Sequence, residues 1–135
     1  MSRIAEARTI AKKIIQEQEI YKLSHGHYAD NFVELNPDII GNIKPENNMQ
    51  WVSRPNLYFS LRHNKGEQFQ LSQADEFFVT VTFNRGYNLY YHNKPRGLTG
   101  RCYGFQPFGH KVCEKLTGEK HNGNDSQTYY ADRDL

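Results

Sequence analysis

The longest regular pattern of apolar side chains lies at the start of the chain. Over residues 3–24, apolar positions recur every three or four residues, the spacing that gathers them on one side of an α-helix. This stripe runs through Ile4, Ala7, Ile10, Ala11, Ile14, Ile15, Gln18 and Tyr21. Two further apolar residues, Ile20 and Leu23, lie off the stripe, where the segment that follows can cover them. Gly26 can adopt the left-handed conformation that ends many helices, so we expect the segment 1–25 to be helical, with a regular helix over residues 3–24 that is roughly 33 Å long.

The segment after this helix, residues 26–55, lacks a sustained periodicity. Its first part, "DNFVEL", is expected to form a short helical turn that directs Phe32, Val33 and Leu35 inward. The stretch "NPDIIGNIKPENN" is rich in turn-forming residues, and its two prolines argue against a regular element. We therefore expect an irregular connector here.

Beyond the connector, the pattern changes from helical to alternating. Four segments have the β-branched and aromatic composition of strands, and short polar or glycine-containing breaks separate them. These segments are residues 56–64, 67–73, 76–84 and 87–93. In the third segment one face carries Phe77, Val79, Val81 and Phe83. We expect a four-stranded antiparallel meander over residues 56–93, with the opening helix packed on its apolar face.

The last part of the chain, residues 94–135, is rich in glycine and proline and then becomes polar. We expect one short helical turn at "HKVCEKL" and a surface tail that Tyr129 and Tyr130 can dock. Cys102 and Cys113 bracket the Gly/Pro-rich loop, at a spacing that matches no zinc or redox motif. This favours a disulfide formed in an oxidising compartment; the alternative is two free thiols in the cytosol.

Composition agrees with a single domain over residues 1–135. Of these residues 37% are hydrophobic and 13% are aromatic, which suits a sheet with one packed face. The net charge of +2 is small and both signs are interspersed, so no basic stripe points to nucleic acid. No apolar run reaches the roughly 18 residues that a membrane span needs, and no signal peptide is recognisable. We expect a chain that has been trimmed at its start.

Candidate chemistry is sparse, and the sequence predicts neither an enzyme nor a cofactor or metal site. His25 and His27 at the helix end fit a polar turn better than a metal site, which usually needs four ligands. The other histidines are His63, His92, His110 and His121, spread over expected loops and strand ends. The tail aspartates Asp125, Asp132 and Asp134 are candidates for calcium, but without EF-hand spacing a solvated tail is favoured.

The sequence offers two other candidate sites. His110 and Cys113 lie three residues apart without a nucleophile motif, and a disulfide would remove that thiol from chemistry. Arginines and tyrosines mix along the expected strands, where they can stack on bases or sugars, although half-buried sheet aromatics are the simpler interpretation. The residues of this mixture are Arg54, Tyr58, Arg62, Tyr87, Tyr90 and Tyr91.

Two stretches of the sequence resemble the soluble part of type IV pilins and of the pseudopilins of type II secretion. The first, "AEARTIAKKIIQEQEIYKLSHGHYADNFVEL", is similar to the end of the pilin helix. Its matching residues are Tyr21, Gly26, Tyr28, Ala29, Asp30 and Leu35. The second, "RCYGFQPFGHKVCEKLTG", resembles the C-terminal pilin segment that carries a cysteine pair. The leader, the cleavage-site glycine and the apolar half-helix of that family are not in the sequence.

The resemblance implies a pilin-like α+β fold and a structural function. The chain would be a subunit of a pilus or pseudopilus filament, with the helix stripe facing the filament. The sheet face and the Cys102–Cys113 loop would form the outer surface and part of the subunit contacts. Its partners would be other copies of itself and, through a missing N-terminal segment, the inner membrane. It would work in the cell envelope or outside the cell. The alternative is a secreted or periplasmic module that binds carbohydrate or peptide on an aromatic sheet face.

Overall fold

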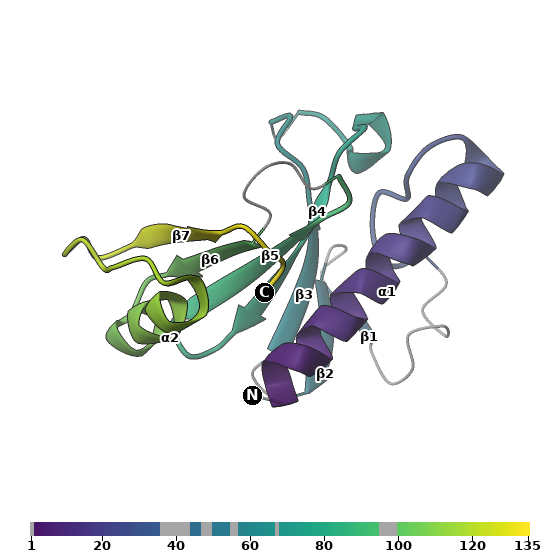
Figure 1. The fold of residues 1–135 in the computed structure, drawn as a ribbon. Helices are drawn as coiled ribbons and strands as arrows, with labels where there is room; N and C mark the ends of the chain where they lie inside the picture. Colours follow the sequence, from purple (N-terminus) through teal and green to yellow (C-terminus); the bar gives the residue numbers. More distant parts are fainter. Residues whose placement is uncertain (1, 36–43, 47–49, 55–56, 67, 95–99) are drawn as a thin grey trace.

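The computed structural model describes residues 2–35, 44–46, 50–54, 57–66, 68–94 and 100–135, and it has an α+β architecture. One long helix opens the chain, an antiparallel sheet follows, and a second helix lies between the last two strands (Figure 1). The helices are α1 (Ser2–His25) and α2 (Pro107–Thr117), with a 3-10 turn, η2 (Leu71–Gln73). The strands are β1 (Lys44–Glu46), β2 (Gln50–Arg54), β3 (Leu57–Arg62), β4 (Phe78–Phe83), β5 (Tyr87–His92), β6 (Gly100–Gly104) and β7 (Gln127–Ala131).

The strands pair in the order in which they occur along the chain, and every pair is antiparallel. The register places Val81 of β4 between Phe59 of β3 and Leu89 of β5. Further along this row of paired residues, Leu89 pairs with Cys102 of β6, and Cys102 pairs with Tyr129 of β7. All five side chains are fully buried, so this row forms the floor of the core.

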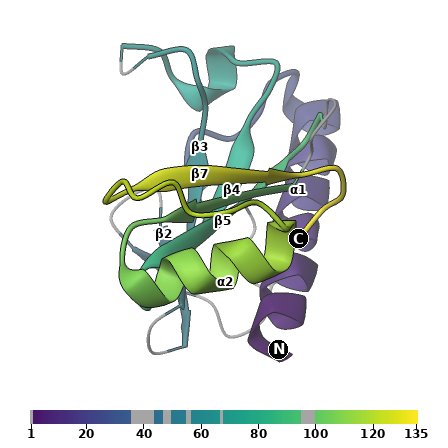
Figure 2. The same ribbon diagram turned by 60° about the vertical axis from the view of Figure 1, so that its left-hand side comes forward.

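Both helices cover this one face of the sheet. The long helix α1 packs over β4 and β5, whereas α2 packs over β5, β6 and β7. Figures 1 and 2 show the two helices on the same side of the sheet, with the end of the chain between them. The core therefore lies in one layer between a row of strands and a pair of helices.

The N-terminal helix and its end agree with the sequence prediction. Gly26 has a φ of 84°, and its N–H donates to the Lys22 carbonyl oxygen at 2.7 Å. In the turn that follows, Glu34 N–H donates to the Asn31 side-chain oxygen at 3.0 Å. Phe32 is buried as expected, but the prediction for Val33 was wrong, because its side chain is 63% exposed.

The predicted four-stranded meander is smaller than the sheet in the structure. Three of its strands exist as β3, β4 and β5, while residues 68–73, the described part of the segment predicted at 67–73, do not form a strand. Here Phe69 N–H donates to the Gly66 carbonyl oxygen at 3.2 Å, and Gln70 N–H donates to the Gln73 side-chain oxygen at 2.8 Å. These backbone groups of the segment form their hydrogen bonds locally. β3 and β4 pair directly with each other, so there is no place for a strand between them.

Four strands lie in parts of the chain that were predicted to be irregular. β1 and β2 fall inside the expected connector, and Pro45 occupies β1 at the edge of the sheet, where a missing N–H donor is tolerated. β6 and β7 fall in the expected loop and tail, and Tyr129 is fully buried. The expected single turn at "HKVCEKL" is part of α2, an eleven-residue helix.

The last three residues tie the helices together. Lys12 of α1 forms an ion pair with Asp134, and Arg8 donates to the main-chain oxygen of Leu135 at 3.4 Å. From the other side, Arg133 donates to the carbonyl oxygen of Leu116 in α2 at 3.1 Å. Leu135 is only 6% exposed and so completes the core between α1 and α2.

Candidate assembly surface

One line of residues holds α1 on the sheet. Ala7, Ala11 and Ile14 have no exposed surface, and neither has Gln18, one turn further along. The buried Gln18 amide makes two hydrogen bonds with one residue: Ala29 N–H donates to its oxygen at 2.8 Å, and its nitrogen donates to the Ala29 carbonyl at 3.0 Å. Because a buried polar group must be paired, this clamp fixes the chain that leaves α1.

Tyr28 closes the same end of the helix. Its hydroxyl donates to Glu19 at 2.8 Å and accepts from the Asn93 side-chain amide at 3.0 Å. Its ring lies edge-on to Phe77, 4.8 Å between centroids. Burial raises the pKa of Tyr28 to about 12, and the hydrogen bond to Glu19 and its charge act in the same direction. Residues that carry the resemblance to pilins therefore make the joint between α1 and the sheet.

The predicted filament-facing stripe divides into two groups. Ala7, Ala11 and Ile14 are fully buried against the chain's own sheet, so they have no surface left for another subunit. The stripe residues that keep part of their surface exposed are Ile4, Ile10, Ile15 and Tyr21. The surface of α1 that is open to a partner therefore lies on the flanks of the stripe.

The far end of α1 carries two apolar side chains that the following segment could have covered but leaves exposed. Ile20 is 48% exposed and Leu23 is 88% exposed. Ile20 borders a hollow of about 440 Å³ that Glu17 and Glu34 also line. We call Glu17, Ile20, Leu23 and Glu34 the acidic end. Desolvation raises the pKa of the neighbouring Tyr21, and the charges of Glu34 and Asp30 act in the same direction.

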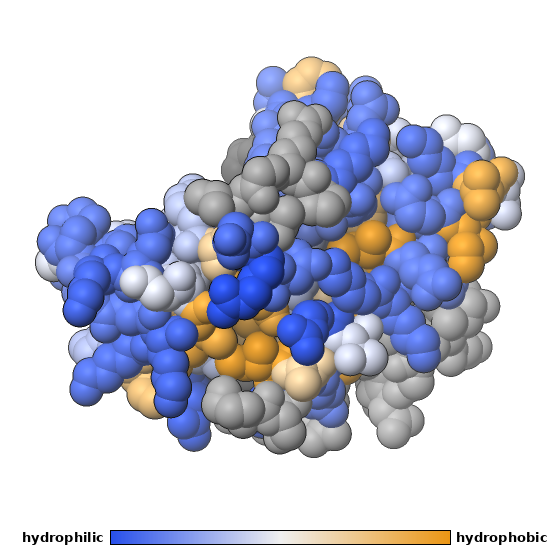
Figure 3. Space-filling view, viewed as in Figure 1, coloured by the Kyte–Doolittle hydropathy of each residue, from blue (hydrophilic) through white to orange (hydrophobic). Residues whose placement is uncertain are grey.

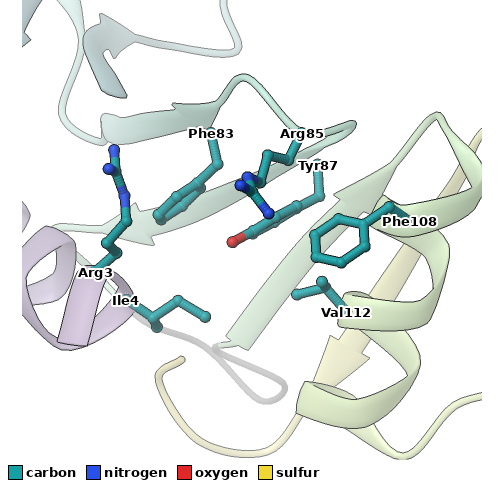
Figure 4. Close-up of a pocket in the computed structure, with 7 residues that line it drawn as sticks. All are labelled: Arg3, Ile4, Phe83, Arg85, Tyr87, Phe108 and Val112. Carbon is teal, nitrogen blue, oxygen red and sulfur yellow. The ribbon is translucent and has the colours of Figure 1, made fainter. Parts of the chain in front are cut away.

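The opposite end of α1 borders a groove with the opposite charge. It has a volume of about 380 Å³ and lies between the start of α1, the β4–β5 turn and α2 (Figure 4). We call its lining residues the basic groove: Arg3, Ile4, Phe83, Arg85, Tyr87, Phe108 and Val112. The rings of Phe83 and Tyr87 stack with their centroids 4.7 Å apart. Burial raises the pKa of Tyr87, while the charges of Arg3 and Arg85 oppose that shift.

The disulfide prediction is confirmed. Cys102 of β6 and Cys113 of α2 are bonded, with their Cα atoms 5.5 Å apart, and both residues are fully buried. The bond fixes α2 on the sheet. The alternative of two free thiols does not hold, and no thiol remains at Cys113 to act as a nucleophile beside His110.

The structure separates most of the histidine and aspartate candidates. Among the described residues, no three potential metal ligands come together. His25 stacks on Tyr21, with centroids 3.8 Å apart, and its Nδ1 contacts a carbonyl oxygen in its own helix. His110 and His121 do meet, as stacked rings 3.7 Å apart, which their separation along the sequence does not reveal. His110 is fully engaged, with Nδ1 bonded to the Tyr129 hydroxyl and Nε2 to the Asp125 carbonyl oxygen.

The aromatic mixture splits between the two faces of the sheet. Tyr87 and Tyr91 point into the core. On the opposite face, the Arg101 guanidinium lies 5.2 Å from the Tyr90 ring centroid and 6.0 Å from that of Tyr130. Tyr130, which the sequence analysis assigned to the tail, is 39% exposed and completes this row.

The space-filling view places these features on the surface. Hydrophobic surface is visible between α1 and α2 and again over the far end of α1, with hydrophilic residues between the two regions (Figure 3). The face in view thus carries apolar surface near each end of the long helix.

Comparison with known proteins assigns no family. No family model matches the chain, and neither a curated protein nor a solved structure matches it. Within the part of the chain that the structure describes, no helix is both long and apolar enough to cross a bilayer.

Proposed function

We propose that this chain is the globular head of a type IV pilin or pseudopilin and that its function is structural. The observation that carries the proposal is the partial cover of α1. One residue per turn, namely Ala7, Ala11, Ile14 and Gln18, is fully buried against the chain's own sheet. Apolar side chains on the flanks and at the far end are left open, and this supports packing of α1 against further helices.

The second support is the way in which α1 joins the sheet. Gln18 clamps Ala29, and Tyr28 links Glu19 to Asn93. These contacts hold the helix rigidly on the head, so that a pull or push along α1 is transmitted to the sheet. The Cys102–Cys113 bond gives the other end of the head a covalent closure. A rigid head that is cross-linked within the chain, on a helix with exposed apolar surface, suits a subunit that is stacked many times in a filament.

The proposal includes a membrane stage and a location. Before assembly, an apolar segment upstream of α1 would hold the subunit in the inner membrane. After assembly, the heads would lie in the cell envelope or outside the cell, with copies related by a repeated head-to-tail contact. A contact of this kind does not close on itself, so its repetition produces a fibre.

The direct test is to produce the full-length protein in a bacterium that has a pilus assembly machinery. Filaments sheared from the cells and labelled with antibodies to residues 1–135 should carry label along their whole length in electron micrographs. The matched control joins residues 1–135 to a cleaved secretion signal, which should give a monomer in the periplasm. If the full-length protein also appears only as a periplasmic monomer, the proposal is wrong.

A second candidate function rests on the outer face of the sheet. The Tyr90–Arg101–Tyr130 row offers flat aromatic surface beside a guanidinium, which suits a carbohydrate or a peptide. In this case a Tyr130→Ala variant should lose binding to a glycan or peptide that the unmodified chain retains on an array. An absence of bound ligands on such arrays would remove this candidate.

A further inference from the structure

We propose that the basic groove of one copy receives the acidic end of a second copy of the same chain, with Ile20 and Leu23 entering the groove. This inference rests on the proposed function, for which it names the contact between subunits. The two surfaces are different and border opposite ends of α1, which makes the contact heterologous rather than two-fold symmetric.

The geometry fits a repeat along the helix. Ile4 lines the basic groove and Leu23 lies in the last two turns of α1. At 1.5 Å per residue, these positions are about 28 Å apart along the helix axis. A copy whose acidic end enters the groove of its neighbour is therefore displaced roughly along α1, and each copy still offers one unused groove and one unused acidic end.

The charges of the two surfaces are complementary. The groove has Arg3 and Arg85 at its rim, and the guanidinium of Arg85 lies 5.5 Å from the ring centroid of Phe108. The acidic end has Glu17 and Glu34, and neither forms an ion pair within the described part of the chain. The nearby cation Lys22 is turned toward the domain itself, 4.7 Å from the Tyr28 ring centroid. Bringing the two surfaces together places carboxylates against guanidinium groups.

The apolar parts are complementary as well. Leu23 is 88% exposed and Ile20 48%, while the groove offers the half-exposed ring of Phe108 above the buried rings of Phe83 and Tyr87. Two aliphatic side chains are a small contact, well below the area of a stable dimer. The contact is therefore weak between isolated heads and becomes effective when an assembled fibre repeats it many times.

Photo-cross-linking tests where the acidic end goes. A Leu23→Cys variant is labelled with a benzophenone maleimide; the native Cys102 and Cys113 are buried and bonded, so the label goes to position 23. The probe is irradiated in purified residues 1–135 at high concentration and in filaments of the full-length protein. Mass spectrometry then locates the cross-linked residue. The matched control carries the probe at Lys120→Cys, which is exposed on the loop between α2 and β7.

The inference predicts cross-links between chains from position 23 to residues 83–87 or 105–112, and none to these residues from position 120. If filaments form but the probe at position 23 reacts elsewhere on its neighbour, this contact is wrong while the filament function stands. If isolated heads give the expected cross-link but the full-length protein forms no filaments, the contact stands and the filament function is wrong.

A charge exchange tests the electrostatic part of the contact. Arg85→Glu should lower the yield of the cross-link between chains by about fivefold, because it places like charges opposite each other. Combining Arg85→Glu with Glu17→Arg in the same chain should restore most of the yield. An Arg85→Glu variant that cross-links as well as the parent chain would show that these charges do not guide the contact.

Discussion

The two helices cover the same face of one sheet, but they are held in different ways. A disulfide joins α2 to β6, and at Gly109 a β-carbon would lie 1.8 Å from the Gly86 carbonyl oxygen, so the helix is in direct backbone contact with the β4–β5 turn. In contrast, α1 has no covalent link, is fully buried along one line of residues, and leaves Leu23 almost fully exposed. The comparison indicates that a disulfide and a backbone contact hold α2, whereas side-chain packing along one line holds α1 and leaves apolar surface exposed at its far end.

The buried and exposed sides of α1 should respond differently to the loss of an isoleucine. Ile14→Ala should lower the free energy of unfolding by about 2–5 kcal/mol, because it leaves a cavity against the sheet. Ile20→Ala, the matched control on the same helix, should lower it by less than about 1 kcal/mol, since that side chain is already half in water. Denaturant unfolding measures both values. Equal losses of unfolding free energy would mean that α1 is not held on the sheet through one side alone.

Removing the covalent link tests the other helix. The double variant Cys102→Ala/Cys113→Ala should lower the free energy of unfolding by about 3 kcal/mol, through the loss of loop closure in the unfolded chain. Hydrogen exchange should show the larger loss of protection in α2 and the smaller loss in α1. If α1 loses more protection than α2, the disulfide does not act by holding α2 on the sheet.

The polar clamp at the end of α1 should have a smaller effect. Gln18→Ala leaves the Ala29 N–H and carbonyl groups unpaired in a buried position, at a cost of about 1–3 kcal/mol in unfolding free energy. Gln16→Ala is the matched control, because it removes the same side chain from an exposed position of the same helix. Thermal unfolding of both variants would show the difference, and similar melting temperatures would contradict the clamp.

The smallest effect is expected in alkali. The pKa of Tyr28 is about 12 in the folded chain and near 10 in an unfolded one. Stabilisation from the neutral hydroxyl is therefore complete below pH 10 and is lost as the pH rises from 10 through 12. Tyr28→Phe should show a shallower fall in stability over this range than the parent chain, with Tyr130→Phe as the exposed control. If the stability of Tyr28→Phe and of the parent chain falls equally over this pH range, burial does not raise the pKa of Tyr28.

Local pattern predicts the parts of the fold that depend on nearby residues. The apolar spacing of α1, the alternation in β3, β4 and β5, and the cysteine pair were all read from the sequence and are present in the structure. The strand predicted at residues 67–73 has the right composition, but its backbone groups are bonded within the turn. Composition alone does not tell which strand lies next to which.

The parts that were missed depend on contacts between distant segments. The tail around Tyr129 is polar, yet it forms β7 because the free edge of β6 offers hydrogen-bond partners. The basic groove joins Arg3 to Arg85 only because α1 crosses the sheet beside the β4–β5 turn. The segment after α1 could have covered Leu23, but it turns toward Gln18 and leaves the Leu23 side chain 88% exposed. Such surfaces require the packed arrangement before they can be recognised.

In the proposed filament, assembly uses the open flanks of α1 and leaves the outer face of the sheet in water. Hydroxyl-radical footprinting, compared between filaments of the full-length protein and dispersed subunits, tests it most directly. Oxidation of Ile15, Ile20 and Leu23 should fall several-fold on assembly, while oxidation of Tyr130 should be unchanged. Protection of Tyr130, with the three α1 residues oxidised as readily as in free subunits, would contradict it.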